Sequence, residues 1–267
     1  MLNGLDLFSG IGGLSLALSG WVKPIAYCEN DRYAQSVLLS RMQSGQLELA
    51  PIWDDVCTLR GEHFGTRSVD IIYGGFPCQD ISVAGAGRGL VGERSRLFWQ
   101  IERLIKETNP RFVFLENVPA IRTRGLNSVI QSLAELGYDC RWTIVSAKEV
   151  GACHVRKRWF MLAHSSRSNL RQQSGRSEGA QREATAIDAI DGKPWADSNS
   201  NGPGLEGVGR SESKIPRPVV YNGWVSEPTV CRRDNGIPHK SHRLRGLGNA
   251  VVPAQAREAF KRLCGLE

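Results

Sequence analysis

The expected architecture follows from Leu5–Leu18, LDLFSGIGGLSLAL, near the start of a chain of 267 residues. It begins with a short apolar run typical of a strand, continues through a glycine-rich turn at Ser9–Gly13, and resumes with leucines and an alanine at helical spacing. In this order a backbone can approach a ligand closely and present free N–H groups at the helix start. The glycine spacing differs from G-x-G-x-x-G, so the turn alone is equally compatible with a plain βα connection.

Glu29 favours ligand binding at this turn. It follows the next apolar run, Ile25–Cys28, about twenty residues after the glycines. An acidic side chain in this place can accept hydrogen bonds from ribose hydroxyls. We therefore expect an adenosine-containing ligand.

Short apolar runs alternate with amphipathic stretches through residues 1–163, as in strand–helix units around a mainly parallel sheet. The expected strands are Leu5–Phe8, Ile25–Cys28, Val69–Tyr73, Phe112–Leu115 and Trp159–Leu162. Apolar residues at helical spacing between Leu97 and Ile105, and between Leu126 and Leu136, predict core-facing helices. A last helix is expected to open at Pro253.

Charge and composition single out the middle of the chain. The net charge is +7, and residues 164–247 hold 13 Lys plus Arg against 9 Asp plus Glu. This block is rich in Ser, Arg, Gly and Pro, which predicts loops and a polyanionic partner. No signal peptide or membrane span is expected, and seven cysteines without a C-x-x-C pair favour neither disulfides nor a metal site.

A cysteine, Cys78, follows the strand expected at Val69–Tyr73, in a loop shaped by Gly75 and Pro77. Ligands bind at this edge of open α/β sheets. A lone cysteine is more often a small buried hydrophobe, but its place in this loop favours a nucleophile.

Charged residues stand at the ends of two further expected strands: an acidic residue follows one strand, and basic residues precede the other. Glu116 lies at the end of Phe112–Leu115 and is either an ion-pair partner or a general acid. Arg156 and Arg158 introduce Trp159–Leu162 on one face, with Lys157 on the other. A solvated charge cluster is the alternative explanation for these basic residues.

Taken together, the motifs resemble the DNA (cytosine-5) methyltransferases, in that family's order. They are DLFSGIGG at residues 6–13, GFPCQ at 75–79, ENV at 116–118, R-x-R at 156–158 and GNAVVP at 248–253. The resemblance implies a Rossmann-like α/β methyltransferase sheet that takes S-adenosylmethionine as methyl donor, together with a small, loop-rich target-recognition domain. Its divisions are a catalytic domain at 1–163, a target-recognition region at 164–243 and a C-terminal segment at 244–267 that returns to the catalytic domain.

The resemblance also implies roles for single residues. The catalytic set would be Cys78 as nucleophile, Glu116 at the pyrimidine N3, and Arg158 with Arg156 at O2. The donor would be bound by Phe8, Ser9, Gly10, Gly12, Gly13, Glu29, Asp55, Pro77 and Asn249, with Asp54 as an alternative to Asp55. His154 stands where the family commonly has Gln, and the motif usual before the final Gly-Asn stretch is not evident, so base specificity is open.

The expected activity is methylation of C5 of a flipped cytosine in double-stranded DNA, in restriction-modification or phage DNA methylation, by a cytoplasmic monomer without a metal. The alternatives are a tRNA cytosine-5 methyltransferase of the same family and a catalytically silent DNA-binding regulator. A nicotinamide dehydrogenase is disfavoured because the glycine spacing differs.

Overall fold

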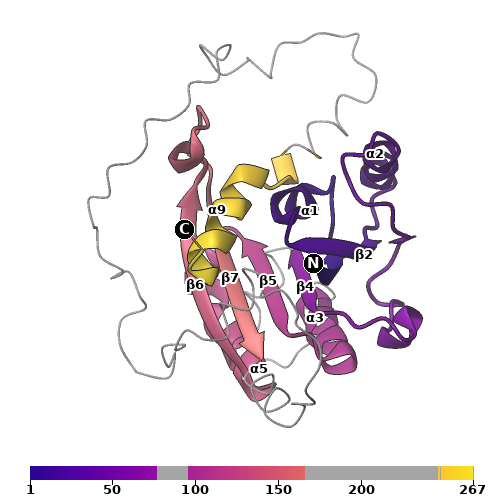
Figure 1. Ribbon diagram of the computed structural model, residues 1–267. Coiled ribbons are helices and arrows are strands. Elements are labelled where there is room, and N and C mark those ends of the chain that lie inside the picture. The colour runs from indigo at the N-terminus through magenta and orange to yellow at the C-terminus, as the bar shows by residue number, and fades with distance from the viewer. Residues whose placement is uncertain (77–95, 166–245, 247, 267) are drawn as a thin grey trace, which may run out of the picture.

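A seven-stranded sheet in the order β3-β2-β1-β4-β5-β7-β6 organises the chain. The computed structural model describes residues 1–76, 96–165, 246 and 248–266. The first five strands in this order run parallel, and β7 lies antiparallel between β5 and β6 (Figure 1). The strands are β1 (Leu2–Leu7), β2 (Val22–Cys28), β3 (Ile52–Trp53), β4 (Ile71–Gly75), β5 (Phe112–Asn117), β6 (Tyr138–Ser146) and β7 (Lys157–Ser165).

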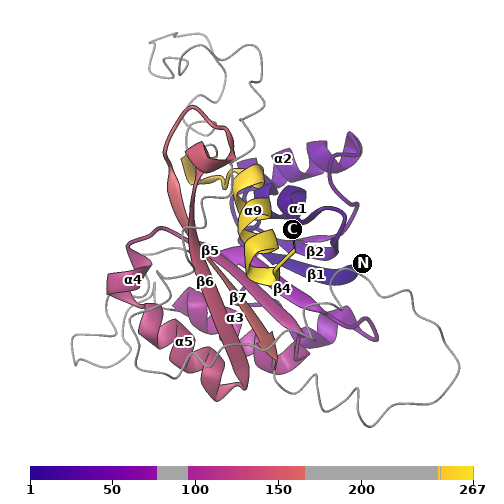
Figure 2. The same cartoon turned by 60° about the vertical axis from the view of Figure 1, so that its left-hand side comes forward.

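Helices cover both faces of the sheet, and Figure 2 shows α9 on the side opposite α3 and α5. They are α1 (Gly13–Leu18), α2 (Arg32–Gln43), α3 (Arg96–Thr108), α4 (Ile121–Arg124), α5 (Leu126–Glu135) and α9 (Pro253–Cys264), with short 3-10 turns at Gly61–Phe64 and Ala147–Val150.

Alternating strand residues feed two separate cores, because successive side chains of a strand point to opposite faces. On β5, Val113 and Leu115 join the core under α3 and α5, whereas Phe112 and Phe114 join the core under α1 and α9. All four side chains are buried. Burial on both faces explains why this strand has a continuous apolar run instead of an alternating one.

The expected α/β architecture around a mainly parallel sheet is confirmed, and each strand expected from an apolar run is present. Two strands were missed. β3 has only two residues, and β6 is an edge strand in which Asp139, Arg141 and Thr143 interrupt the apolar residues. Neither produces the continuous apolar run that marks a strand buried on both faces.

The described C-terminal segment returns to the sheet and packs against β6 and β7. α9 begins at Pro253, buries Phe260 against Phe114 and Trp21, and packs beside α1. Residues far apart in sequence therefore pack together on one face of the sheet. Within the described ranges, no helix has the length and apolar character needed to cross a bilayer.

Candidate active site

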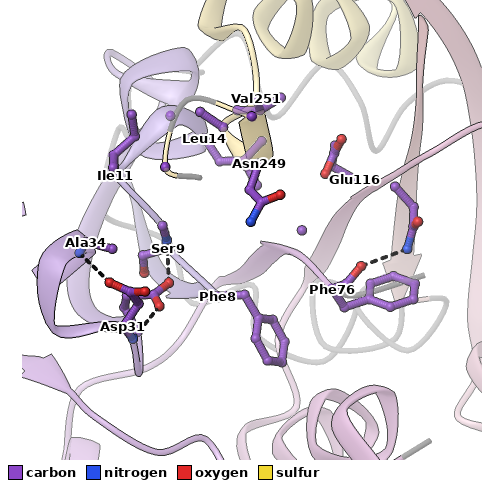
Figure 3. A pocket seen from close by; sticks show the side chains of 18 of the residues that line it. Phe8, Ser9, Ile11, Leu14, Asp31, Ala34, Phe76, Glu116, Asn249 and Val251 are labelled. Atoms are coloured by element: carbon purple, nitrogen blue, oxygen red, sulfur yellow. Dashed lines mark hydrogen bonds between the residues drawn. The ribbon is translucent and has the colours of Figure 1, made fainter. Parts of the chain in front are cut away.

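A cavity of about 460 Å³ opens at the carboxyl ends of β1, β2, β4 and β5. Its walls come from the glycine turn after β1, the residues after β2, the end of β5 and the segment before α9 (Figure 3). The side chain of Asn249 points into the space between the glycine turn and Glu116. The volume lies in the range of small-molecule sites, and the position is where ligands bind in open α/β sheets.

The glycine turn is built from left-handed backbone. Gly10 has a φ of 53° and Gly12 a φ of 82°, while Phe8 adopts a φ of 54° without being glycine. A left-handed non-glycine residue costs about 1–2 kcal/mol, and such strain gathers at functional sites. The turn therefore aims the Phe8 side chain at the cavity margin and leaves Gly10 open beside it.

The three glycines of the turn have different tasks. Gly10 lines the cavity, whereas Gly12 does not. A Cβ on Gly12 would lie 2.6 Å from a Leu47 methyl group. A Cβ on Gly13 would lie 2.7 Å from Val251 Cγ1. Gly12 thus permits close packing of the turn, and Gly13 lets the C-terminal segment close over it.

Glu29 follows β2 directly and braces the turn. Its Oε2 accepts a hydrogen bond of 2.6 Å from the Gly10 N–H, and its Oε1 accepts one of 2.8 Å from Asp31 N–H. A carboxylate has about four lone-pair sites, so both oxygens keep capacity for ligand hydroxyls.

Glu116 occupies the opposite wall of the cavity. Its Oε1 lies 2.9 Å from Arg158 Nε, and both side chains are mostly buried. Burial raises the pKa of Glu116 to about 7, although the positive charges of Arg158 and Arg156 oppose the shift. A carboxyl group with such a pKa can carry a proton at neutral pH and donate it as a hydrogen bond.

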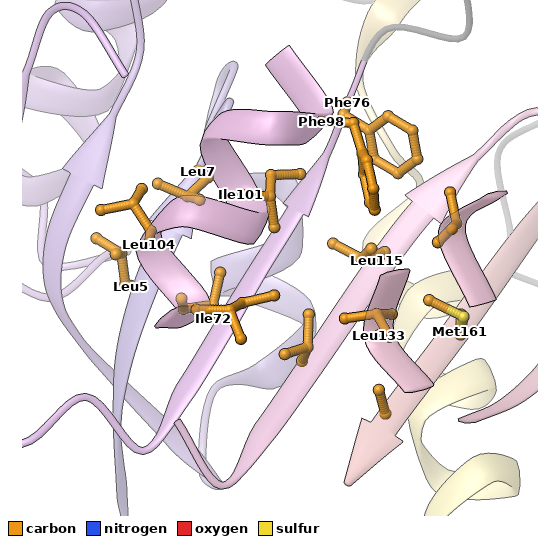
Figure 4. Packing of buried hydrophobic residues seen from close by; sticks show 14 of the residues in the cluster. Leu5, Leu7, Ile72, Phe76, Phe98, Ile101, Leu104, Leu115, Leu133 and Met161 are labelled. Carbon is orange, nitrogen blue, oxygen red and sulfur yellow. The ribbon is translucent and has the colours of Figure 1, made fainter. Parts of the chain in front are cut away.

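Neighbouring residues position Glu116. A Cβ on Gly75 would lie 2.7 Å from Glu116 Oε2, so only glycine leaves room for the carboxyl group. Asn117 is buried and donates from Nδ2 to the carbonyl oxygen of Phe76 at 2.9 Å. The Phe76 ring packs beside Phe98 in the core, as Figure 4 shows. The end of β4 is thereby attached to the end of β5.

The two arginines of the R-x-R motif point to different partners. Arg158 pairs with Glu116, but Arg156 Nη2 donates to the carbonyl oxygens of Gly248 and Ala250, each at 2.7 Å. Arg156 therefore binds the segment that carries Asn249, and its influence on Glu116 is electrostatic.

Sequence reasoning missed a buried polar group beneath the turn. Asp6 is fully buried, Ser15 Oγ donates to its Oδ2 at 2.5 Å, and the Ser15 and Tyr73 hydroxyls lie 2.8 Å apart. Burial raises the pKa of Asp6 to about 7. An acidic residue inside an apolar strand run was the available signal, because such a group is seldom buried without a partner.

The remaining expected site residues are placed as follows. Ser9 lines the cavity with its backbone, since its Oγ donates to the Asp6 carbonyl at 2.9 Å. Asp55 is exposed outside the lining, and its Oδ1 accepts from Cys57 N–H at 2.8 Å. Asp54 is also outside the lining. Cys78 and Pro77 lie outside the described residues.

The strand order, the antiparallel β7 and the cavity beside a glycine turn define a Rossmann-like methyltransferase fold. Comparison with known proteins narrows this class. A family model described as C-5 cytosine-specific DNA methylase matches residues 2–208. The chain belongs to this family.

Individual relatives agree with the family assignment. The Type II methyltransferase M.CviJI of Paramecium bursaria Chlorella virus IL3A is 36% identical over 257 residues, which are 96% of this chain and 58% of the relative. The Type II methyltransferase M.HhaI of Haemophilus parahaemolyticus is 31% identical over 171 residues, which are 62% of this chain and 50% of the relative.

A solved structure supports the fold alone. The Dnmt2 methyltransferase of S. pombe superposes with a TM-score of 0.51 at 22% identity, covering 73% of this chain and 62% of that one. The present chain spans about half the length of the curated relatives it matches.

Proposed function

We propose that the protein is a DNA (cytosine-5-)-methyltransferase that uses S-adenosylmethionine as methyl donor. The observation that carries this proposal is the mostly buried Glu116–Arg158 pair, which faces the glycine turn and Glu29 across one cavity. The residues proposed to bind the methyl donor and the acid proposed to contact the acceptor base then line the same cavity. Membership in the C-5 cytosine-specific DNA methylase family supports the same activity.

The donor fits the residues that are present. Gly10 leaves an open cradle at the turn, Glu29 offers carboxylate oxygens suited to a ribose diol, and Phe8 and Asn249 border the same cavity. In our proposal Ser9, Gly12 and Gly13 shape this cradle, and Pro77 and Asp55 complete it from outside the described lining. When bound, S-adenosylmethionine supplies an electrophilic methyl group on a sulfonium centre.

The acceptor chemistry explains the other residues. C5 of cytosine is a weak nucleophile, so we propose that the Cys78 thiolate first adds to C6 and makes the ring enamine-like. Glu116 hydrogen-bonds N3 and stabilises the charge that enters the ring, while Arg158 holds O2. After methylation of C5, a base removes its proton and the thiolate leaves, giving 5-methylcytosine. Arg156 acts mainly by positioning the wall that carries Asn249.

The acceptor is proposed to be duplex DNA with the target base flipped out of the stack, at a cost of about a few kcal/mol. Residues 164–243, inside the most basic block of the sequence, would form the target-recognition region and contact phosphates and groove edges. We propose that residues 1–163 and 244–267 form the catalytic domain. We further propose that the protein acts as a monomer in the cytoplasm, in restriction-modification or phage DNA methylation.

Transfer of label from S-[methyl-³H]adenosylmethionine tests the proposal. Duplex DNA should gain label, bulk tRNA should not, and digestion should recover the label as 5-methylcytosine. Cys78→Ala should abolish transfer, and Cys153→Ala, which removes an exposed thiol, is the matched control. Label in tRNA alone would show that the chain acts on tRNA, and retention of DNA without any transfer would indicate a silent regulator.

A further inference from the structure

Gln255, on the first turn of α9, is a fully buried polar side chain. Its Nε2 donates to the Val145 carbonyl at 2.6 Å and to the Arg156 carbonyl at 2.7 Å. Two carbonyl acceptors at this position require the amide nitrogen there, which settles the orientation of the side chain. One side chain of α9 thus joins the end of β6 to the residue before β7.

The backbone that Gln255 holds is strained. Arg156 has a φ of 21°, in the left-handed region that favours glycine. The preceding carbonyl, that of Val155, accepts hydrogen bonds from Ser146 Oγ at 2.7 Å and from Ala147 N–H at 3.0 Å. Such a conformation persists only where surrounding contacts determine it. The Arg156 carbonyl accepts from Gln255 Nε2 at 2.7 Å and, at the longer distance of 3.4 Å, from Ala147 N–H.

The Arg156 side chain returns to the C-terminal segment. Its Nη2 donates to the carbonyl oxygens of Gly248 and Ala250, which flank Asn249 in the cavity wall. The next residue, Val251, closes on Gly13 of the glycine turn. Gln255 and Arg156 therefore form a reciprocal clasp, in which α9 holds the Arg156 backbone and the Arg156 side chain holds the segment leading into α9.

We propose that Gln255 is a positioning residue for the donor site, which acts through Arg156 to hold Asn249 and Val251 in the cavity wall. The inference rests on the proposed donor site, and neither the family match nor the sequence motifs assign Gln255 a role. The backbone at Arg156 leads directly into Arg158. The clasp therefore also connects the cavity wall that carries Asn249 to the Glu116–Arg158 pair.

Calorimetric titration of the full chain with S-adenosylhomocysteine tests the clasp. Gln255→Met keeps the side-chain length but removes the donor. Arg156→Lys keeps the charge on a shorter side chain, which reaches less far toward the carbonyl oxygens of Gly248 and Ala250. Each change should raise Kd by about tenfold, in line with the loss of one or two buried hydrogen bonds. The Kd of the double variant for S-adenosylhomocysteine should be at most about twice that of the single variant with the higher Kd, because the two residues act in one clasp.

Tyr138→Phe is the matched control. It also removes a buried hydrogen bond to a carbonyl, that of Pro110, but at the opposite end of β6. It should lower thermal stability about as much as Gln255→Met and leave Kd within about twofold. If Gln255→Met lowers stability in the same way but leaves Kd unchanged, Gln255 has only a structural role and the inference is wrong.

Other outcomes are equally decisive. Additive losses in the double variant would show that Gln255 does not act through Arg156. If Gln255→Met does not fold, Arg156→Lys decides, and an unchanged Kd in that variant overturns the clasp. Failure of the unaltered chain to bind S-adenosylhomocysteine would overturn the donor site itself and the clasp with it. Binding by the unaltered chain without an effect of the variants overturns the clasp alone.

Discussion

Asp6 and Glu116 are carboxyl groups whose pKa values are raised to about 7 by burial, but their surroundings differ. Glu116 faces the cavity beside Arg158, whereas Asp6 lies under the glycine turn with Ser15. The shift at Glu116 places a proton where the proposed chemistry uses one. Asp6 is not among the residues that line the cavity, so we expect its shift to affect folding stability and not the chemical step.

Glu116→Gln is expected to lower kcat for methyl transfer by about 10²–10⁴-fold, the usual contribution of a general acid, with little loss of stability. In the unaltered protein Glu116 is mostly protonated below pH 7, so its proposed contribution to the rate falls as the pH rises through about 7. Pre-steady-state rates between pH 6 and 9 should show this decline, and the Gln variant should lack it. An unaltered rate in the variant would remove Glu116 from the mechanism.

Asp6→Asn is expected to flatten the pH dependence of stability. The native pKa of Asp6 is raised above 3.8, so the native state binds the proton more tightly than the unfolded chain. The unaltered protein should therefore lose about 2–4 kcal/mol relative to the Asn variant as the pH rises from 4 to 8. Urea unfolding of both proteins across this range measures the difference. Parallel stability curves would contradict a raised pKa.

At the scale of elements, β4 ends in two adjacent glycines with different neighbours. A Cβ on Gly74 would lie 2.3 Å from the Leu7 carbonyl oxygen, in the backbone of β1. A Cβ on Gly75 would instead meet Glu116 Oε2, the end of a side chain that can move. The first glycine is thus required by the sheet and the second by the site.

The pair predicts opposite outcomes for two alanine substitutions. Gly75→Ala should keep the stability within about 1 kcal/mol while displacing Glu116 and reducing kcat by at least about tenfold. Gly74→Ala should lower the free energy of unfolding by more than about 2 kcal/mol, because backbone must move. Urea denaturation and initial rates measured on both variants provide the comparison. Equal losses of stability in the two would contradict this division of roles.

The sequence predicts elements well where burial is symmetric and poorly at the sheet edges. β1, β4 and β5 have apolar runs that are easy to recognise, because helices cover both faces of these strands. β6 contains Asp139 and Arg141, and β3 is too short for any periodicity. Helices α3 and α5 were visible because each buries one stripe of apolar residues.

At the scale of the molecule, the far end of the chain completes the core. Phe260 of α9 is buried and contacts Phe114 edge to face at a centroid distance of 5.2 Å. Phe260→Ala should lower the free energy of unfolding by about 3–5 kcal/mol, as expected for a large aromatic side chain removed from a core. Arg262→Ala, on the exposed side of α9, should cost less than about 1 kcal/mol. A loss below 1 kcal/mol for Phe260→Ala would mean that α9 is dispensable.

The candidate site was partly predictable for the same reason that the fold was. Glu29 and Glu116 directly follow or end apolar strands, so parallel-sheet geometry brings them to one edge. The resemblance implied that Glu116 and Arg158 act on one base, but the ion pair between their side chains was not predicted. The clasp of Gln255 and Arg156 was not predictable, because it joins residues 99 positions apart through a backbone carbonyl, which leaves no local pattern in the sequence.

In the proposed mechanism a cysteine of this chain attacks the target base, and covalent trapping detects that attack. With S-adenosylmethionine and a duplex containing 5-fluorocytosine, the C5 fluorine cannot leave as a proton does, so the adduct should persist. Peptide mass spectrometry should place the adduct on Cys78, and Cys153→Ala should form it equally well while Cys78→Ala forms none. Methyl transfer to duplex DNA without an adduct, or an adduct on a different cysteine, would show that Cys78 is not the nucleophile.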